Sequence, residues 1–317
     1  MKIGVFLECL RGWALDDALA FLSQHEVQCL EVGTFGEFVA FEYRLEDLLA
    51  DGRQRKELLA RVEAAGLEIS AFGCYGNPLH PDAGRALRQQ DRFSKTVELA
   101  ALLGVPTVTE FAGCPGDSEE ARYPNWISML ALDDFAKILD WQWSERVLPY
   151  WERAATFAAD HDVRVALELF PGSVVFNPRT LMRLRDAVGP AIGALVDPSH
   201  LFWQQIDIPA AVRYLGPAVH RIHLNDSQLR PQNLAEAGVL NPVAGLGWTD
   251  KTWVHRTVGF GHGAEFWKDF VAGAVEIGYG GDLCIEQGDP LFADDDGIAK
   301  AAAFVRSIAP SNDRRDA

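Results

Sequence analysis

Short apolar runs alternate along this chain with longer segments whose apolar residues recur at helical spacing. The clearest runs are 165–167, 192–196 and 219–222, and a carboxylate or a histidine follows each of them directly. Runs of this length, apolar at nearly every position, are typical of strands buried on both faces of a parallel sheet. Because strands and helices alternate throughout, the pattern predicts one (β/α)8 TIM barrel with its active site at the strand C-termini.

The remaining elements complete eight such units. We expect strands at 3–7, 27–32, 68–72, 107–111, 165–168, 192–197, 219–223 and 282–286. We expect helices at 15–22, 53–65, 85–103, 145–159, 180–187, 208–215, 264–277 and 295–308. Gly66 and Gly104 follow two of these helices, where glycine commonly ends a helix.

Two segments interrupt the alternation. Residues 113–143 form an insertion after the fourth strand, and its tryptophans are expected to stack on a sugar, enter the core or form a subunit contact. Residues 227–251 form an extended polar loop after the seventh strand, which we interpret as a lid. The whole chain, 1–317, is predicted to be one domain with a flexible tail at 311–317.

Composition narrows the possible partners. The formal net charge is −16, and no cluster of lysine and arginine offers a groove for phosphates, which argues against a nucleic-acid partner. No apolar run is long enough to span a membrane and no secretory signal is evident, so we expect a soluble cytoplasmic protein. The five cysteines form no CxxC pair, and we expect buried, reduced thiols, with thiolate-bound zinc as the alternative.

The predicted strands five to eight end in residues that commonly bind metals. These residues are Glu168, Asp197, His223 and Glu286. Neighbouring barrel strands bring their ends together, so we expect all four to converge on one divalent cation. An oxygen-rich set with open positions favours Mn²⁺, and Mg²⁺, Co²⁺ or Zn²⁺ also fit. For any one of these acids alone, and for Glu31 at the second strand's end, a structural role bonded to loop amides is the alternative.

Other polar residues are candidates for contact with a substrate. His200 lies three positions after Asp197. We expect it to lie beside the metal, either as a catalytic group in contact with the substrate or as a hydrogen-bond donor to a metal ligand. The candidate substrate-binding residues are Arg256, Arg230, His255, Glu110 and His80. Solvent exposure or a structural role remains the alternative for these loop and strand-end residues.

Several of these segments also carry a family resemblance. Asp-Pro-Ser-His-Leu-Phe-Trp at 197–203, Ile-His-Leu-Asn-Asp at 222–226 and Arg-Thr-Val-Gly-Phe-Gly-His at 256–262 resemble the xylose isomerase-like TIM barrels, the sugar phosphate isomerase/epimerase group. The resemblance implies that Glu168, Asp197, His223 and Glu286 bind one metal. It also implies that the two glutamates move the proton, as in ketose epimerases, and that His200 lies beside the substrate.

Two departures from the family pattern bear on the activity. The repair endonucleases of this group have Asp-x-His where this chain has Trp-Val-His at 253–255, and they have a histidine where Glu110 stands. With the acidic charge, this argues against DNA cleavage. The epimerases carry a further glutamate where this chain has Val174, which leaves a ketose-epimerase assignment open.

The predicted function is therefore a divalent-metal-dependent sugar isomerase or epimerase in carbohydrate metabolism. A carboxylate would remove a proton next to a metal-bound carbonyl and give an enediolate. The alternative is a lyase or dehydratase that eliminates a β-substituent from a 3-keto-sugar, a 3-keto-glycoside (C-glycoside deglycosidase-type included) or an inosose. A non-catalytic or partner-dependent subunit is the second alternative. Expected partners are a small sugar or keto-sugar and either a homo-oligomer (dimer or tetramer) or a heteromeric subunit.

Overall fold

The computed structural model describes residues 1–240, 247 and 249–309 of the chain. The predicted tail at 311–317 and part of the predicted lid lie outside the described residues. Within the described part, no helix has the length and apolar character needed to cross a lipid bilayer.

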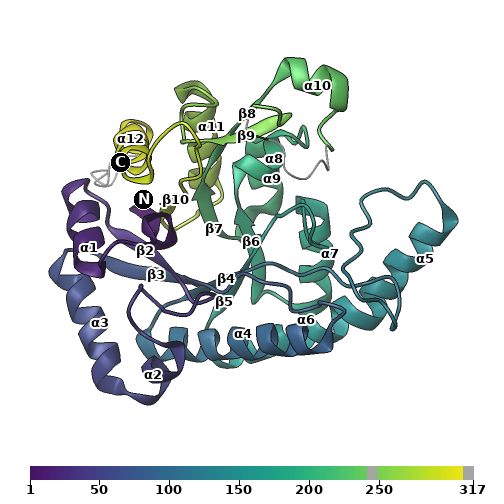
Figure 1. The fold of residues 1–317 in the computed structure, drawn as a ribbon, viewed down its shortest axis with the longest axis horizontal. Helices are drawn as coiled ribbons and strands as arrows, with labels where there is room; N and C mark the ends of the chain where they lie inside the picture. The colour runs from purple at the N-terminus through teal and green to yellow at the C-terminus, as the bar shows by residue number, and fades with distance from the viewer. Residues whose placement is uncertain (241–246, 248, 310–317) are drawn as a thin grey trace.

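Eight parallel strands close into a barrel in the order β1-β10-β7-β6-β5-β4-β3-β2 (Figure 1). Their bounds are β1 Ile3–Phe6, β2 Cys29–Gly33, β3 Glu68–Gly73, β4 Thr107–Glu110, β5 Arg164–Glu168, β6 Ile192–Val196, β7 Val219–Leu224 and β10 Leu283–Ile285. The predicted TIM barrel is confirmed. The eight strands lie at the predicted positions, because most of them are short runs rich in apolar residues that are buried on both faces.

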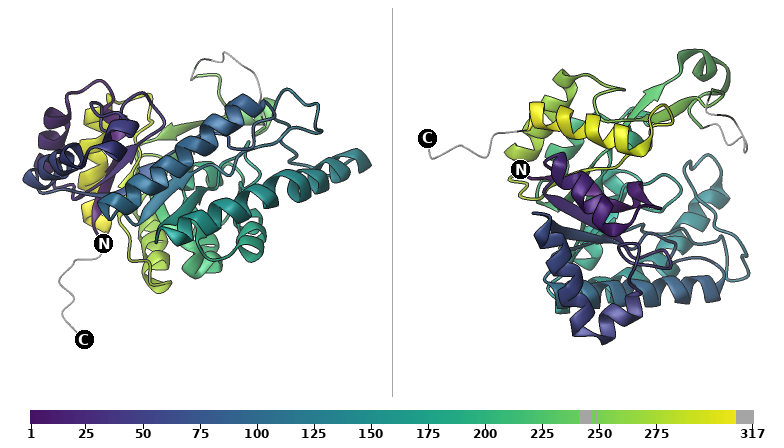
Figure 2. Two further views of the ribbon diagram at one scale, coloured as in Figure 1. Left: turned by 90° about the horizontal axis from the view of Figure 1, so that it is seen from below. Right: turned by 60° about the vertical axis from the view of Figure 1, so that its left-hand side comes forward.

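Helices surround the barrel on the outside (Figures 1 and 2). They are α1 Leu15–Gln24, α2 Leu45–Ala50, α3 Gly52–Ala64, α4 Ala83–Leu103, α6 Leu148–Asp160, α7 Pro178–Val188, α8 Pro198–Phe202, α9 Ile208–Leu215, α11 Ala264–Glu276 and α12 Asp294–Ile308. Local sequence sets their ends. The Asp82 side chain accepts from Arg85 N at the start of α4, and Gly104 ends that helix in the left-handed conformation with φ 68°.

The interior of the barrel is partly ionic. The largest buried side chains, among them Trp151 and Trp267, are aromatic residues packed with the main apolar core. Inside the barrel, however, Arg221 of β7 is buried between Glu31 of β2 and Asp282. Branched apolar residues usually fill this space in TIM barrels. A charged interior of this kind requires matched partners, because an unpaired charge would be costly to bury.

The insertion after β4 is a projecting arm. After an irregular stretch the insertion forms α5 (Asp133–Trp141). This helix continues through a π-helical turn, η2 (Gln142–Val147), into α6. The predicted helix start at residue 145 therefore lies inside η2. Figure 1 shows α5 extending away from the barrel. Trp143 is buried with the Arg183 guanidinium 3.9 Å from its ring centroid, so this tryptophan belongs to the core.

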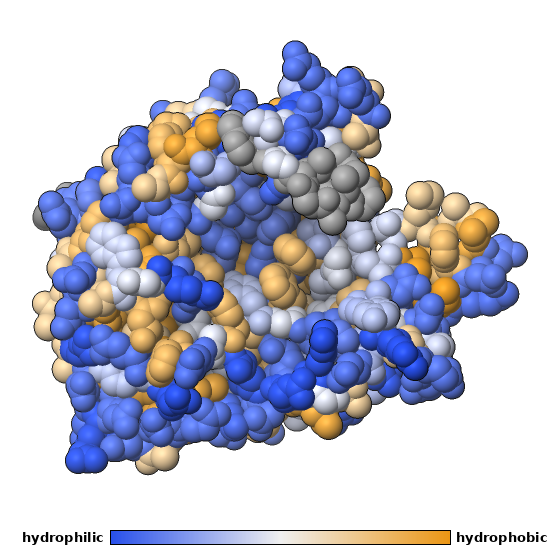
Figure 3. All heavy atoms as spheres, viewed as in Figure 1, coloured by the Kyte–Doolittle hydropathy of each residue, from blue (hydrophilic) through white to orange (hydrophobic). Residues whose placement is uncertain are grey.

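The segment interpreted as a lid contains regular structure. β8 (Asp226–Leu229) pairs antiparallel with β9 (Trp253–Arg256), and α10 (Pro231–Ala237) lies between them. The predicted loop at 227–251 thus holds α10 and most of β8, which the sequence did not predict, because short and mostly polar elements carry no clear apolar pattern. The β8–β9 hairpin continues from β7, and Figure 3 shows a hollow in the middle of the face below it.

A close backbone approach gives a test of the barrel packing. Gly193 lies in β6, and a Cβ there would be closer than 3.0 Å to the His220 ring of β7. Gly193→Ala should therefore lower the free energy of unfolding by about 1–3 kcal/mol in urea titrations followed by tryptophan fluorescence. The matched control is Gly280→Ala, where no heavy atom lies within 4 Å of the added Cβ. Equal losses for both variants would contradict the packing.

Candidate metal centre

The four predicted ligands meet at one mouth of the barrel. Glu168 ends β5, Asp197 follows β6, His223 lies near the end of β7, and Glu286 follows β10. One atom each of Asp197, His223 and Glu286 lie within 4.8 Å of one another, and the same holds for Glu168, Asp197 and His200. Asp197 belongs to both groups. The parallel strands thus bring residues distant in sequence around a single carboxylate.

Asp197 is the centre of this arrangement. It is fully buried, and its Oδ1 accepts a hydrogen bond of 2.8 Å from Ser199 N at the start of α8. Its Oδ2 is buried with no hydrogen-bond partner. Burial raises the pKa of Asp197 to about 7; the charge of His200 opposes this shift, and the neighbouring Glu286 and Glu168 add to it. A buried carboxylate oxygen without a donor is costly, so this atom suits a cation.

His200 lies between two of the acids. Its Nε2 is 2.9 Å from Glu168 Oε1 and 3.5 Å from Asp197 Oδ2. Burial opposes a charge on this ring, but the charges of Asp197 and Glu168 outweigh it and raise the pKa of His200 to about 9. The imidazole therefore presents a proton to the acidic cluster.

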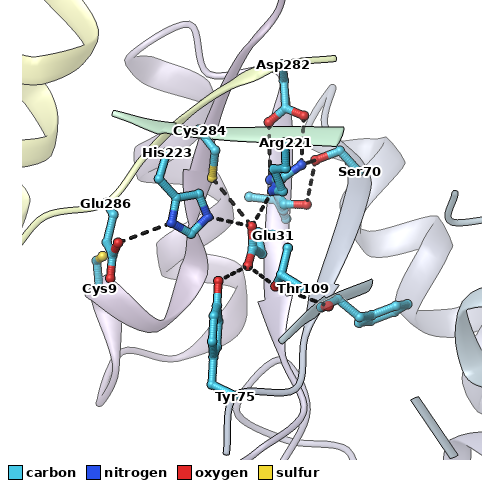
Figure 4. Close-up of polar contacts among 12 residues, drawn as sticks. Cys9, Glu31, Ser70, Tyr75, Thr109, Arg221, His223, Asp282, Cys284 and Glu286 are labelled. Carbon is cyan, nitrogen blue, oxygen red and sulfur yellow. Dashed lines mark hydrogen bonds and ion pairs between the residues drawn. The ribbon is translucent and has the colours of Figure 1, made fainter. Parts of the chain in front are cut away.

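His223 connects the centre to the ionic interior of the barrel (Figure 4). Its Nδ1 lies 3.1 Å from Glu286 Oε2, and its Nε2 lies 2.8 Å from Glu31 Oε2. Burial opposes protonation of the ring, but Glu31 outweighs it and raises the pKa of His223 well above its usual value. Both ring nitrogens of His223 thus lie within hydrogen-bond distance of a carboxylate.

Glu31 is held on every side. Its Oε2 also accepts from Arg221 Nε, and its Oε1 accepts from Tyr75 Oη at 2.8 Å and from Thr109 Oγ1 at 2.6 Å. Although burial disfavours the charge, Arg221 and His223 hold the pKa of Glu31 well below its usual range. The sequence left the role of Glu31 open. The structure shows a buried carboxylate bonded to side chains of other strands, beside a metal-type ligand.

The residues present fit a divalent cation. Three carboxylates and one imidazole nitrogen form a donor set of the kind that Mn²⁺, Mg²⁺, Co²⁺ or Zn²⁺ accepts. Without a cation, only protons on His200 and His223 offset the acids within the two groups. Asp197 Oδ2, which accepts no hydrogen bond and has His200 Nε2 at 3.5 Å, is the most direct sign of a place for a metal.

Two predicted substrate contacts lie on the hairpin next to the centre. His255 of β9 has its ring centroid 5.7 Å from that of His200, and its Nδ1 is buried without a hydrogen-bond partner. Burial lowers the pKa of His255 to about 4, so the ring is neutral. Arg256 donates from Nε to Asp289 Oδ2 at 2.8 Å and from Nη1 to Gln228 at 2.7 Å, which fixes its guanidinium.

The other three predicted contacts lie outside the two ligand groups. Glu110, at the end of β4, is buried and accepts from Gly76 N at 2.7 Å, which holds the loop after β3. His80 accepts from a backbone N–H through Nδ1. Arg230 precedes α10 and donates to Thr249 O at 3.2 Å.

A row of aromatic rings forms a feature that the sequence analysis missed. We call it the aromatic arc, and it consists of Phe6, Phe35, Tyr75, Phe111 and Phe170. Successive ring centroids lie 4.6–6.3 Å apart, and the last ring is 4.8 Å from His200. Each ring ends one of the strands β1 to β5 or follows it within two positions. That spacing is the sequence signal that could have revealed the arc.

Asp226 secures the loop beyond the hairpin. Its buried carboxylate accepts from the backbone N–H groups of Gly259, Gly261 and His262 at 2.8–3.2 Å and from His262 Nδ1 at 2.7 Å. A Cβ at Gly261 would collide with the Asp226 carboxylate, so this close approach requires glycine. Asp226 thus fixes the segment that follows β9.

Comparisons with known proteins identify the family of the fold. A family model described as xylose isomerase-like TIM barrel matches residues 19–308. The uncharacterized protein YfiH of Bacillus subtilis (strain 168) is 34% identical over 313 residues, which cover 96% of this chain and 98% of YfiH.

Solved structures with low sequence identity share the fold. The IolI protein with a bound zinc atom has a TM-score of 0.64 at 16% identity, covering 97% of this chain and 98% of IolI. The probable 3-DHS dehydratase AsbF from Bacillus anthracis has a TM-score of 0.64 at 13% identity (96% and 99% covered). A D-psicose 3-epimerase crystallised with D-fructose has a TM-score of 0.59 at 14% identity (97% and 99% covered).

Removing one negative charge at the centre should weaken metal binding and, at the same time, raise the stability of the metal-free protein. Asp197→Asn keeps the oxygen that caps α8 but removes one of three neighbouring acids. We predict that Mn²⁺ affinity in calorimetric titrations falls at least about 100-fold, because losing even an outer partner of a ligand costs 10–100-fold. The chelator-treated variant should melt at a higher temperature than the wild type, because like charges are relieved.

Asp207→Asn is the matched control, because Asp207 caps α9 in the same way away from the centre. Its Mn²⁺ affinity should equal that of the wild type. Wild-type affinity in Asp197→Asn would contradict the assignment of this centre.

Proposed function

The chain belongs to the xylose isomerase-like TIM barrel family, and from this premise we propose that it is a divalent-metal-dependent sugar isomerase or epimerase. The observation that carries the proposal is the placement of Glu168 and Glu286. They come from β5 and β10 and lie in different ligand groups that share Asp197. Two carboxylates beside one cation are suited to moving a proton at a carbon next to a carbonyl.

The cation would be held by Glu168, Asp197, His223 and Glu286, with Mn²⁺ expected first for this oxygen-rich set. When bound, it would polarise a sugar carbonyl and stabilise the negative charge that develops on the oxygen. IolI, which shares the fold, was crystallised with a bound zinc atom, and this supports a divalent ion in the present chain.

The two glutamates would act as the acid and base. Glu168 is nearly fully buried, whereas the Glu286 side chain is 29% exposed, so their surroundings differ. One carboxylate would remove the proton next to the carbonyl to give an enediolate. If the other returns a proton to the opposite face, the sugar is epimerised; if the proton returns to the neighbouring carbon, the sugar is isomerised. His200, next to Glu168, would hold or donate a proton to a substrate oxygen.

The aromatic arc would form the opposite wall of the site. It lies at the ends of β1 to β5, whereas the acids and His223 lie at or just after the ends of β5, β6, β7 and β10. Aromatic rings pack well against the C–H faces of sugars and leave little room for water. A wall of this kind supports a small carbohydrate or a sugar with an apolar substituent as the substrate.

The arc also favours a second candidate, elimination from a 3-keto-sugar, a 3-keto-glycoside or an inosose. Its rings span the ends of five strands, which suits a substrate larger than a free monosaccharide. The negative neighbours of His200 keep its ring protonated, so it could donate to a departing hydroxyl or aglycone. AsbF, named a probable dehydratase, shares the fold.

Deuterium exchange tests both candidates. Enzyme loaded with Mn²⁺ and incubated in D₂O with keto-sugars and 3-keto-glycosides should place deuterium next to the carbonyl, as read by mass spectrometry. A rearranged or epimerised product supports the first candidate, and release of water or aglycone supports the second. Glu168→Gln and Glu286→Gln should each slow exchange by about 10²–10⁴-fold.

Glu276→Gln serves as the control, because Glu276 lies on α11 in an exposed pair with Arg213. It should exchange at the wild-type rate. No exchange with any substrate of the panel, by metal-loaded wild type, would contradict both candidates.

A further inference from the structure

The proposed chemistry makes no use of Glu31, although this side chain contacts a proposed metal ligand. Glu31 is fully buried inside the barrel, and Figure 4 shows it between Arg221 and His223. Its Oε1 accepts from Tyr75 and Thr109, and its Oε2 accepts from Arg221. A carboxylate that receives so many donors is held as the anion, and it can offer only acceptor atoms to a further neighbour.

That constraint decides which nitrogen of His223 carries a proton. Nε2 lies 2.8 Å from Glu31 Oε2, a hydrogen-bond distance that requires a proton on Nε2. Nδ1, on the other side of the ring, faces Glu286 Oε2 at 3.1 Å. When a cation displaces the Nδ1 proton of the metal-free ring, the proton that remains on Nε2 leaves the Nδ1 lone pair facing a cation shared with Glu286.

The surroundings also fix the orientation of the ring. Phe6 of β1 stacks near His223 with centroids 6.0 Å apart and planes inclined by 29°. Arg221 is held in turn by Asp282, whose Oδ1 lies 3.0 Å from Nη1. A continuous series of contacts therefore leads from Asp282 through Arg221 and Glu31 to His223 (Figure 4).

We propose that Glu31 is a positioning residue that sets the tautomer and orientation of His223 and thereby the affinity of the centre for a divalent metal. The inference rests on the proposed function for the presence of that metal. The competing explanation is that Glu31 serves only to neutralise Arg221 in the barrel. The two explanations predict different metal affinities when each acidic partner of Arg221 is removed separately.

Glu31→Gln and Asp282→Asn form the matched pair. Both remove one negative charge from Arg221, but only the first changes the group that faces His223. We expect Glu31→Gln to weaken Mn²⁺ and Zn²⁺ binding about 10–100-fold in competition titrations with a chromogenic chelator, and Asp282→Asn to change it less than about threefold. Thermal midpoints of the metal-free proteins measure how far each variant is destabilised.

The imidazole proton gives a second readout that a purely structural role would not move. The His223 Nε2–H should appear in proton NMR as a slowly exchanging signal in the wild type and in Asp282→Asn. His223→Gln identifies the signal by its loss. In Glu31→Gln the signal should disappear or exchange rapidly, since the anionic acceptor is gone.

Three results would overturn the inference. Glu31→Gln could bind metal like the wild type, it could retain the slowly exchanging proton, or both variants could lose affinity in proportion to their loss of stability. A wild-type protein that binds no divalent metal would instead contradict the proposed function. In that case the imidazole proton of the metal-free protein still decides whether Glu31 positions His223.

Discussion

An excess of negative charge at one end of the barrel is the constraint on which this site depends. Eight parallel strands end at the same mouth, so the acids that end or follow β5, β6 and β10 must share a small, largely buried space. Buried carboxylates cannot all remain ionised without a positive charge among them. In the metal-free protein, protonated His200 and His223 supply part of that charge, and a divalent metal beside protonated His200 would balance the three carboxylates. The proposed activity uses the same charge to acidify a sugar C–H bond.

A second ionic group inside the barrel behaves differently because its side chains are matched by hydrogen-bond partners. Glu31 and Asp282 flank Arg221, and the hydroxyls of Tyr75 and Thr109 complete the hydrogen bonds of Glu31. A buried, fully satisfied network is rigid and costly to disrupt. The acid-rich centre is thus suited to binding a cation, whereas the hydrogen-bonded group around Arg221 is suited to keeping the barrel interior rigid. His223 contacts both groups, so the rigid group around Arg221 holds this ligand of the metal centre in place.

The sequence predicted the barrel and the convergence of its strand-end acids because both follow from local pattern. An apolar run sets the length of a strand, and the residue after it must lie at the mouth. Other features depend on contacts that no local pattern encodes. Glu31 gains its role from Arg221, 190 positions away. The β8–β9 hairpin depends on the pairing of two short strands that α10 separates, and the aromatic arc depends on contacts between rings at or after the ends of five separate strands.

Anomalous diffraction from crystals soaked in Mn²⁺ tests the central claim most directly. The account predicts one strong peak at the barrel mouth, about 2.2 Å from atoms of Glu168, Asp197, His223 and Glu286, with Nδ1 as the histidine ligand. The absence of a peak there at saturating Mn²⁺ would contradict the account. So would an ion bound without Asp197 and His223, because these two residues join the acids of the mouth into one centre.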